Sequence, residues 1–309
     1  MELKNAILAI VCAVALVGTG CSPTKPVLPT DVSPAAIAAL LTDNDGTEFL
    51  GEITGYDWPD QGREPAELFE WISAAAESPD QATSEQAGVA AHALAGFLGD
   101  QSDERGVAPA GNPELLAAYA EALVPYQGAM IGDSRGTSGF EPLDKLDSIL
   151  QRTASVFTAM RKTPAQENFI SEAKVRAGNY QTQFAEFAAA NPTLPDDHTE
   201  RSYAQWSARL LGLLARSERV AVPGDRSSIP GVAASELRFA IVSRMVHGHD
   251  PRISAEYFDK DGGLVSPTSL KGGPLSLYNA QLINYLSAYS ELESAVAKYE
   301  GTLRAIAGG

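Results

Sequence analysis

Apolar residues near the C-terminal end of this sequence repeat with helical spacing, and this pattern constrains the fold more than any other feature. From Ser276 to Ala307 they alternate at steps of four and three, which keeps their side chains on one face of an α-helix. The residues are Tyr278, Leu282, Tyr285, Tyr289, Leu292, Val296, Tyr299, Leu303 and Ile306. The pattern predicts one long helix with a heptad seam across this segment.

Shorter helical patterns occur along the rest of the chain, whereas the alternation typical of strands is scarce. Breaks rich in Gly, Pro and Asp separate them. The sequence predicts helices over Pro34–Leu41, Pro65–Glu77, Ser84–Leu98, Asn112–Met130 with a kink at Pro125, Pro142–Arg161, Thr163–Asn191, Thr199–Val220 and Ser235–Val246. We therefore predict an all-α fold, a multi-helix bundle with a long heptad-patterned C-terminal helix.

The helical domain is expected to comprise residues 34–309. The stretch Gly132–Gly139 is rich in Gly and Ser, a composition typical of a loop between packed segments. It leaves open a subdivision of the domain into residues 34–132 and 140–309.

The N-terminal segment has the features of a secretory signal peptide. Lys4 precedes the apolar run Ala6–Val17, which has the length of a signal-peptide core and is too short to span a bilayer. The following Val17-Gly18-Thr19-Gly20-Cys21 resembles the lipobox of bacterial lipoproteins, although Gly18 stands where that family usually has Leu. The resemblance implies cleavage of residues 1–20 and acylation, including palmitate, of Cys21. The alternative is an ordinary signal peptide with an incidental cysteine.

Residues 21–33 suit a tether behind such an anchor, because Pro23, Pro26 and Pro29 favour an extended, unpacked chain. The lipobox resemblance thus implies a protein held at the extracytoplasmic face of the cell membrane, with the lipid bilayer as one partner. Cys12 lies in the leader and Cys21 would be acylated, so no cysteine remains for a disulfide or a thiolate site.

The chain is strongly acidic, with a formal net charge of −16 at pH 7. Nucleic acid and anionic lipid headgroups attract basic surfaces, so this charge argues against both as binding partners.

The part after the leader is similar to uncharacterised helical proteins of actinobacteria, which carry a tetratricopeptide-like region and are associated with type VII secretion. The similar stretches are Asn112–Leu116, Val124–Gly128, Gly139–Asp144, Val156–Thr158 and Asn168-Phe169. The resemblance covers residues 112–306 and implies a helical envelope protein. That family offers no catalytic residues to carry over.

Two loop segments contain residue types that bind metal ions. His247, His249 and Asp250 place two imidazoles and a carboxylate close together after a helix, and imidazole is a common zinc or copper ligand. The alternative is a solvated helix end. The segment Phe258–Ser266 is similar to a calcium loop but lacks the closing glutamate, so we predict a tight polar turn there. No cofactor is predicted.

The string Gly132–Gly136 is similar to those around serine nucleophiles, but the strand-turn-helix context that such a nucleophile needs is absent. With no convincing catalytic set, the sequence favours a non-catalytic protein over an enzyme. We predict a membrane-anchored module of the cell envelope that binds another envelope or secreted protein.

We assign the face that would bind a partner to tyrosines of the last helix, namely Tyr278, Tyr285, Tyr289 and Tyr299. The alternative is that this helix packs within the protein's own bundle, with the phenol hydroxyls at its rim. Two other functions remain as alternatives. One is a metal binder or metal-dependent enzyme that uses His247, His249 and Asp250, and the other is a solute-binding lipoprotein, for which we expect strand-rich α/β lobes.

Overall fold

A computed structural model describes residues 24–100, 111–161, 167–195, 198–221, 228–246 and 248–308. The described α-helices are α1 (Pro34–Thr42), α2 (Gly46–Gly55), α3 (Arg63–Ala66), α4 (Glu70–Ala75), α5 (Gln81–Asp100), α6 (Pro113–Leu123), α7 (Gln127–Met130), α8 (Gln151–Met160), α9 (Glu167–Ala190), α10 (Ser202–Ala221), α11 (Ile229–Met245), α12 (Gly273–Leu286) and α13 (Ser290–Gly308). Short 3-10 helices are η1 (Val124–Tyr126), η3 (Thr199–Arg201), η4 (Ala255–Tyr257) and η5 (Pro267–Ser269). The predicted all-α class is confirmed.

Local sequence signals account for several helix ends. Ser33 caps α1, where its hydroxyl accepts a hydrogen bond from the Ala36 N–H and Pro34 follows at the first helical position. Pro125 interrupts the helix that begins at Pro113, and the chain forms the 3-10 turn η1 before it resumes as α7. The predicted kink at Pro125 is therefore confirmed.

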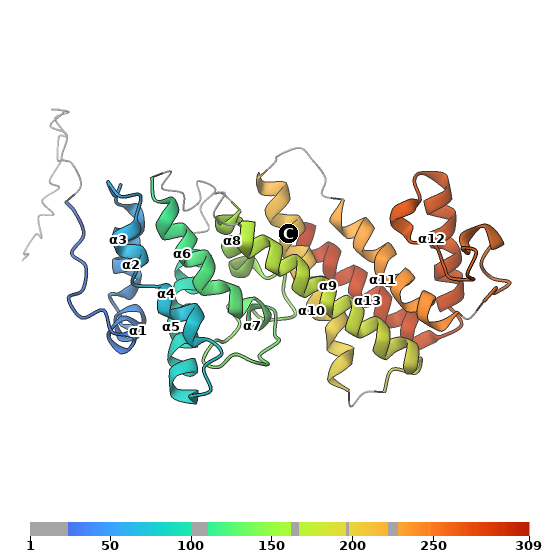
Figure 1. Ribbon diagram of the computed structural model, residues 1–309, viewed down its shortest axis with the longest axis horizontal. Coiled ribbons are helices and arrows are strands. Elements are labelled where there is room, and N and C mark those ends of the chain that lie inside the picture. Colours follow the sequence, from blue (N-terminus) through green and yellow to red (C-terminus); the bar gives the residue numbers. More distant parts are fainter. Residues whose placement is uncertain are drawn as a thin grey trace, which may run out of the picture.

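The molecule is elongated (Figure 1). Helices α1–α6 lie at one end, α9 and α10 occupy the middle, and α12 lies at the opposite end. α10 packs along α9 and α13, and α11 packs against α9. Among the described residues, no helix has the length and apolarity needed to cross a membrane.

The interior contains two clusters of buried apolar side chains. The first runs from Ile37 to Tyr180 and includes the middle of α10, and the second runs from Phe184 to Leu303. The first cluster continues across the loop at residues 132–139, where the sequence left a subdivision of the domain open. The two clusters instead meet within α9 and α10, whose length lets each helix contribute to both.

The single helix expected over Ser276–Ala307 is wrong, because the chain breaks after Leu286 and begins again at Ser290 as α13. The Tyr289 N–H donates to the Leu286 carbonyl at 2.8 Å, which closes a tight turn. The break lets α12 pack against α11 while α13 runs back along α10. Heptad spacing does not reveal it, since Ser287 and Ala288 lie outside the apolar seam.

A second correction concerns the helix expected over Pro142–Arg161, of which only α8 is helical. Leu150 precedes it with a left-handed backbone, φ +51°. The Asp144 carboxylate accepts hydrogen bonds from the Arg152 and Thr153 N–H groups at 3.1 and 2.9 Å. These first-turn amides have no partner within the helix, so a carboxylate at this position fixes the start of α8.

The segment at residues 24–33 is extended, as its prolines predict, but it packs against the N-terminal helices. Lys25 Nζ lies 2.6 Å from a Glu64 carboxylate oxygen and 5.1 Å from the centre of the Trp58 ring. Leu28 packs against the first core. The described part of the expected tether is therefore docked on the domain, which corrects the prediction of an unpacked chain. Residues 1–20 and Cys21 lie outside the described residues.

Close packing of a loop on α5 explains one glycine. A side chain at Gly88 would place its Cβ 1.7 Å from the Ser138 carbonyl oxygen. Only a residue without a Cβ allows the segment before Phe140 to cross α5 at this distance. Phe140 then reaches the core, where its ring stacks on Tyr126 at 5.2 Å.

Candidate functional site

A pocket of about 560 Å³ lies between the start of α11, the turn η5 and the start of α12. It therefore lies in the half of the molecule that carries α12, away from the N-terminal helices (Figure 1). The lining residues are Ser228, Gly231, Val232, Ser235, Glu236, Pro267, Thr268, Leu270, Leu275, Ser276 and Asn279. This volume lies within the range of about 300–1,000 Å³ that is usual for small-molecule sites.

Two buried tyrosines hold the wall of this pocket in place. The Tyr278 hydroxyl donates to the Val265 carbonyl at 2.8 Å, and the Tyr257 hydroxyl donates to the Pro274 carbonyl at 3.1 Å. These bonds attach the segment that carries η5 to the first turn of α12. Pro267 at the first position of η5 fixes the local backbone. The wall is thus built on rigid elements of the second core.

The pocket lining is mainly apolar. Val232, Leu270 and Leu275 supply aliphatic surface, and the buried Pro267 also belongs to the lining. A partly buried polar pair also belongs to the lining, because the Ser235 hydroxyl donates to the Asn279 side-chain oxygen at 2.7 Å. A largely apolar cavity with a few fixed polar groups is the usual composition of a ligand site.

Glu236 is the one charged side chain among the described residues that line the pocket. It is half-buried, and burial raises the pKa of its carboxyl above the ordinary value. Within the described part of the chain, no hydrogen bond or ion pair is made by this carboxylate. An unpaired carboxylate with a raised pKa in a cavity marks a candidate binding site.

The tyrosines assigned to a partner-binding face are mostly buried. Tyr278, Tyr285 and Tyr299 are at most 3% exposed, and Tyr289 is partly exposed. The prediction of an open tyrosine face is therefore wrong for Tyr278, Tyr285 and Tyr299. Large apolar rings at seam positions gain more free energy from burial in the protein's own core than from exposure to water.

The buried tyrosines make their polar contacts within the protein. Tyr299 accepts a hydrogen bond from the Gln181 amide nitrogen at 2.6 Å, which links α13 to α9. Tyr285 lies beneath the Arg252 guanidinium, whose central carbon is 4.0 Å from the ring centre. These side chains stabilise the bundle, which is the alternative that the sequence left open.

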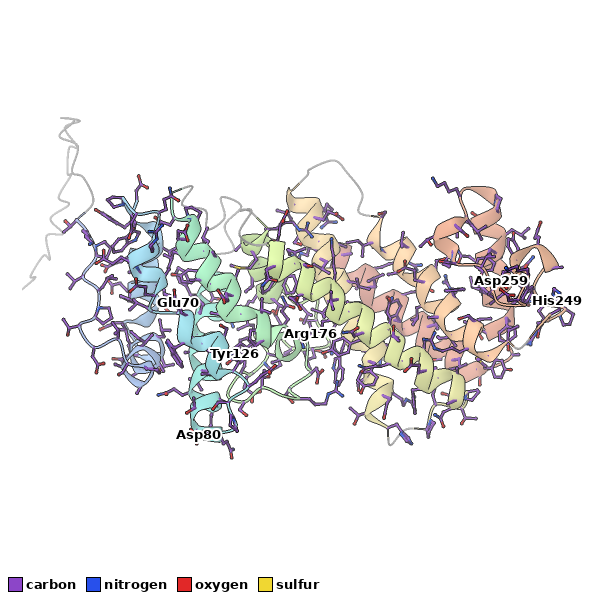
Figure 2. The ribbon with its side chains drawn as sticks, viewed as in Figure 1. Glu70, Asp80, Tyr126, Arg176, His249 and Asp259 are labelled. Atoms are coloured by element: carbon purple, nitrogen blue, oxygen red, sulfur yellow. The ribbon has the colours of Figure 1, made fainter. Side chains whose placement is uncertain are left out.

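The metal candidates lie at the same end of the molecule, where Figure 2 labels His249 near Asp259. His247 lies outside the described residues. His249 is exposed and packs edge-on against Phe258 at 4.9 Å. Both Asp250 oxygens receive hydrogen bonds from Arg252, which hold the pKa of the Asp250 carboxyl at about 2. Among the described residues, no group of three His, Cys, Asp or Glu side chains converges on a common point.

The segment that is similar to a calcium loop forms the polar turn predicted for it. The Asp259 carboxylate accepts hydrogen bonds from the backbone N–H groups of Asp261 and Gly263, each at 2.9 Å. Phe258 and Leu264 close the turn as an isolated bridge. The first carboxylate of the segment is therefore used for the turn itself.

A second polar cluster surrounds Asp133, near Arg176 in the middle of Figure 2. The buried Asp133 carboxylate pairs with both ends of the Arg135 guanidinium at 2.7 and 2.8 Å. The Tyr180 hydroxyl donates to the same carboxylate at 2.6 Å. The Arg135 guanidinium carbon lies 4.9 Å from the Tyr203 ring centre and 4.6 Å from that of Trp206.

This cluster ties the loop after α7 to α9 and α10. Burial alone would raise the pKa of the Asp133 carboxyl, but the hydrogen bonds from Arg135 and Tyr180 outweigh it and hold the pKa below its ordinary value. Ser134, between the paired residues, is exposed. The segment Gly132–Gly136 is therefore a structural loop held against α9 and α10. Its geometry agrees with the predicted loop and not with a serine nucleophile.

Sequence reasoning missed both Glu236 and the Asp133 cluster as organised sites. Glu236 stands in an ordinary amphipathic helix, and nothing in its neighbours signals a cavity. For Asp133, the alternation of charge in Asp133-Ser134-Arg135 was a usable signal, because residues two apart in a loop can pair. No family model, curated protein or solved structure matches this chain.

Proposed function

We propose that this protein is a lipid-anchored lipoprotein of the cell envelope that binds a small, largely apolar molecule without transforming it. The observation that carries the proposal is the pocket of about 560 Å³ with its aliphatic lining. Pockets between helices of a bundle are common ligand sites. A helical protein with such a pocket could therefore bind a solute without the strand-rich lobes that we expected for a solute-binding lipoprotein.

The anchor part of the proposal rests on the sequence. The lipobox-like string that ends at Cys21 supports acylation at the extracytoplasmic face of the cell membrane. Two or three acyl chains give a lasting anchor, because each buried methylene contributes about 0.8 kcal/mol. The bilayer is then the partner of the lipid, and the pocket is left free for a solute.

A non-catalytic role is supported by how the described polar clusters are used. Asp133 is committed to Arg135 and Tyr180, and Asp250 is committed to Arg252. The described residues of the pocket lining include one ionisable group, whereas acid and base chemistry on a bound ligand generally needs two groups with distinct roles. Binding is thus the simplest activity that this geometry supports.

Titration calorimetry with 4-phenylbutan-1-ol tests the binding proposal. The full-length lipidated protein is placed in lipid nanodiscs, and empty nanodiscs give the baseline. We expect saturable binding that Val232→Trp weakens at least about tenfold by filling the pocket. Val175→Trp, on an exposed position of α9 away from the pocket, serves as the matched control. Equal binding by wild type and Val232→Trp would contradict the proposal.

A protein partner is the second candidate, favoured by exposed apolar side chains at the same end. Leu277 and Ile283 on α12 are 51% and 45% exposed. Photo-crosslinking from Ile283 in native membranes tests this candidate, and loss of the crosslink on Leu277→Glu would support it. An unchanged crosslink, or none, would contradict it. A link to type VII secretion stays a prediction from the sequence.

A further inference from the structure

We infer that the ligand of the pocket is an organic monocation, with an apolar body against the aliphatic wall and one ammonium group against Glu236. This inference rests on the proposed ligand-binding function and adds the chemical class of the ligand. It is carried by the position of a single unpaired carboxylate in a mainly apolar cavity.

Glu236 places a half-buried carboxylate in the lining of the pocket. A carboxylate that is half-buried loses part of its hydration, and proteins normally compensate such a group with a cation or with hydrogen-bond donors. Glu236 lacks both among the described residues. A ligand that brings a positive charge and N–H donors would supply the missing interaction.

The arginine nearest to Glu236 in the sequence is already paired with another carboxylate. Arg238 is two residues away from Glu236, but its guanidinium pairs with the buried Glu300 carboxylate on α13. Arg304 pairs with the other oxygen of Glu300 at 2.8 Å. These cations are committed to the packing of α11 on α13, so neither compensates Glu236.

The described pocket lining suits an organic cation better than a metal ion. Calcium and magnesium require about six or more oxygen ligands, usually with several carboxylates. The described lining holds one carboxylate, and the oxygen of Asn279 already accepts a hydrogen bond from Ser235. An ammonium group needs only a few acceptors, and the aliphatic wall formed by Val232, Leu270 and Leu275 suits the rest of an organic molecule.

The field of the whole protein favours the same ligand charge. With a net charge of −16, the protein attracts cations and repels anions over the distance of the ionic atmosphere. Local and global electrostatics therefore select against an anionic solute in this pocket.

The test compares three probes with one carbon skeleton, namely 4-phenylbutylamine, 4-phenylbutan-1-ol and 4-phenylbutanoate. Their affinities are measured by calorimetry at pH 7.5 with the full-length protein in nanodiscs. We expect the amine to bind at least about tenfold more tightly than the alcohol, as a charge-assisted hydrogen bond allows, and the carboxylate to bind most weakly. Glu236→Gln should remove the advantage of the amine over the alcohol.

Glu172→Gln is the matched control, because Glu172 is exposed on α9 and its removal changes the net charge equally. If amine and alcohol bind equally in wild type, or if Glu236→Gln retains the preference, the inferred ligand class is wrong while the binding function stands. If none of the three probes binds, the proposed function itself fails. Circular dichroism of each variant confirms that the helical fold is intact.

Discussion

At the scale of single residues, the interior of this protein is specified by a few polar side chains as much as by its apolar seams. Asp133 is 6% exposed, yet it is charged, because Arg135 and Tyr180 donate hydrogen bonds to both of its oxygens. The network holds a loop against α9 and α10. Replacing one member leaves the others without their partner in a partly dehydrated place.

We predict that Asp133→Asn lowers the free energy of unfolding by about 1 to 3 kcal/mol at pH 7. The folded-state pKa of Asp133 lies below its ordinary value, so its stabilisation is present above about pH 4 and is lost as the pH falls through the folded pKa. The deficit of the variant should therefore shrink in acid. Urea unfolding at pH 7 and pH 3 measures both effects.

Ser134→Ala is the control for this prediction, because Ser134 is exposed between the two paired residues. We expect its free energy of unfolding to change by less than about 0.5 kcal/mol. A deficit of Asp133→Asn that stayed constant from pH 7 to pH 3 would show that the charge of Asp133 is not its source.

The sequence predicts which residues are buried better than it predicts what they do. The spacing of Tyr278 and Tyr299 predicts that they share one face, and both are buried in the second core. Spacing alone cannot say whether that face meets the same chain or a partner. Glu236 could not be recognised, since its unusual surroundings arise from η5 and α12, which follow some 30 residues or more later.

At the scale of elements, the positions of helices were predictable but several of their ends were not. The first turn of α13 carries Glu291 and Glu293, which interact favourably with the positive end of the helix dipole. The same two residues also fit the outer face of an uninterrupted helix. Periodicity therefore could not choose between a continuous helix and the break at Ser287–Tyr289, which tertiary packing decides.

The break predicts a difference between two exposed alanines. Glycine in a helix interior costs about 1 kcal/mol relative to alanine. Ala297 lies inside α13, whereas Ala288 lies in the turn between α12 and α13. We expect Ala297→Gly to lower the free energy of unfolding by about 1 kcal/mol and Ala288→Gly to leave it nearly unchanged. Equal losses in urea unfolding would favour one continuous helix.

At the scale of the whole molecule, the docked N-terminal segment would link the proposed lipid anchor to one end of the elongated protein. Lys25 is held by Glu64 and Trp58 at the end of the molecule formed by α1–α6. Lys25 follows Cys21 by four positions, a stretch of chain that spans at most about 14 Å. A lipid on Cys21 would therefore keep this end near the bilayer and would leave the pocket away from the membrane surface.

The separation of the two ends follows from helix geometry. α9 has 24 residues, and at about 1.5 Å per residue it extends for about 36 Å. It lies between the N-terminal helices and the end that carries α12 (Figure 1). The net charge of −16 would also oppose close contact of the molecule with anionic headgroups, because like charges repel over about 8 Å at physiological ionic strength.

We predict that the lipidated protein stands on the membrane with α12 farthest from it. Fluorophores are attached to single cysteines at two exposed positions, Glu52→Cys on α2 and Ile283→Cys on α12. A quencher on the lipid headgroups should quench the first fluorophore strongly and the second weakly. Inserting 20 Gly and Ser residues after Cys21 should abolish most of the difference, since a flexible linker of that length frees the domain. Equal quenching without the insertion would show that the docked segment does not orient the protein, because membrane attachment itself is verified by flotation of the same samples.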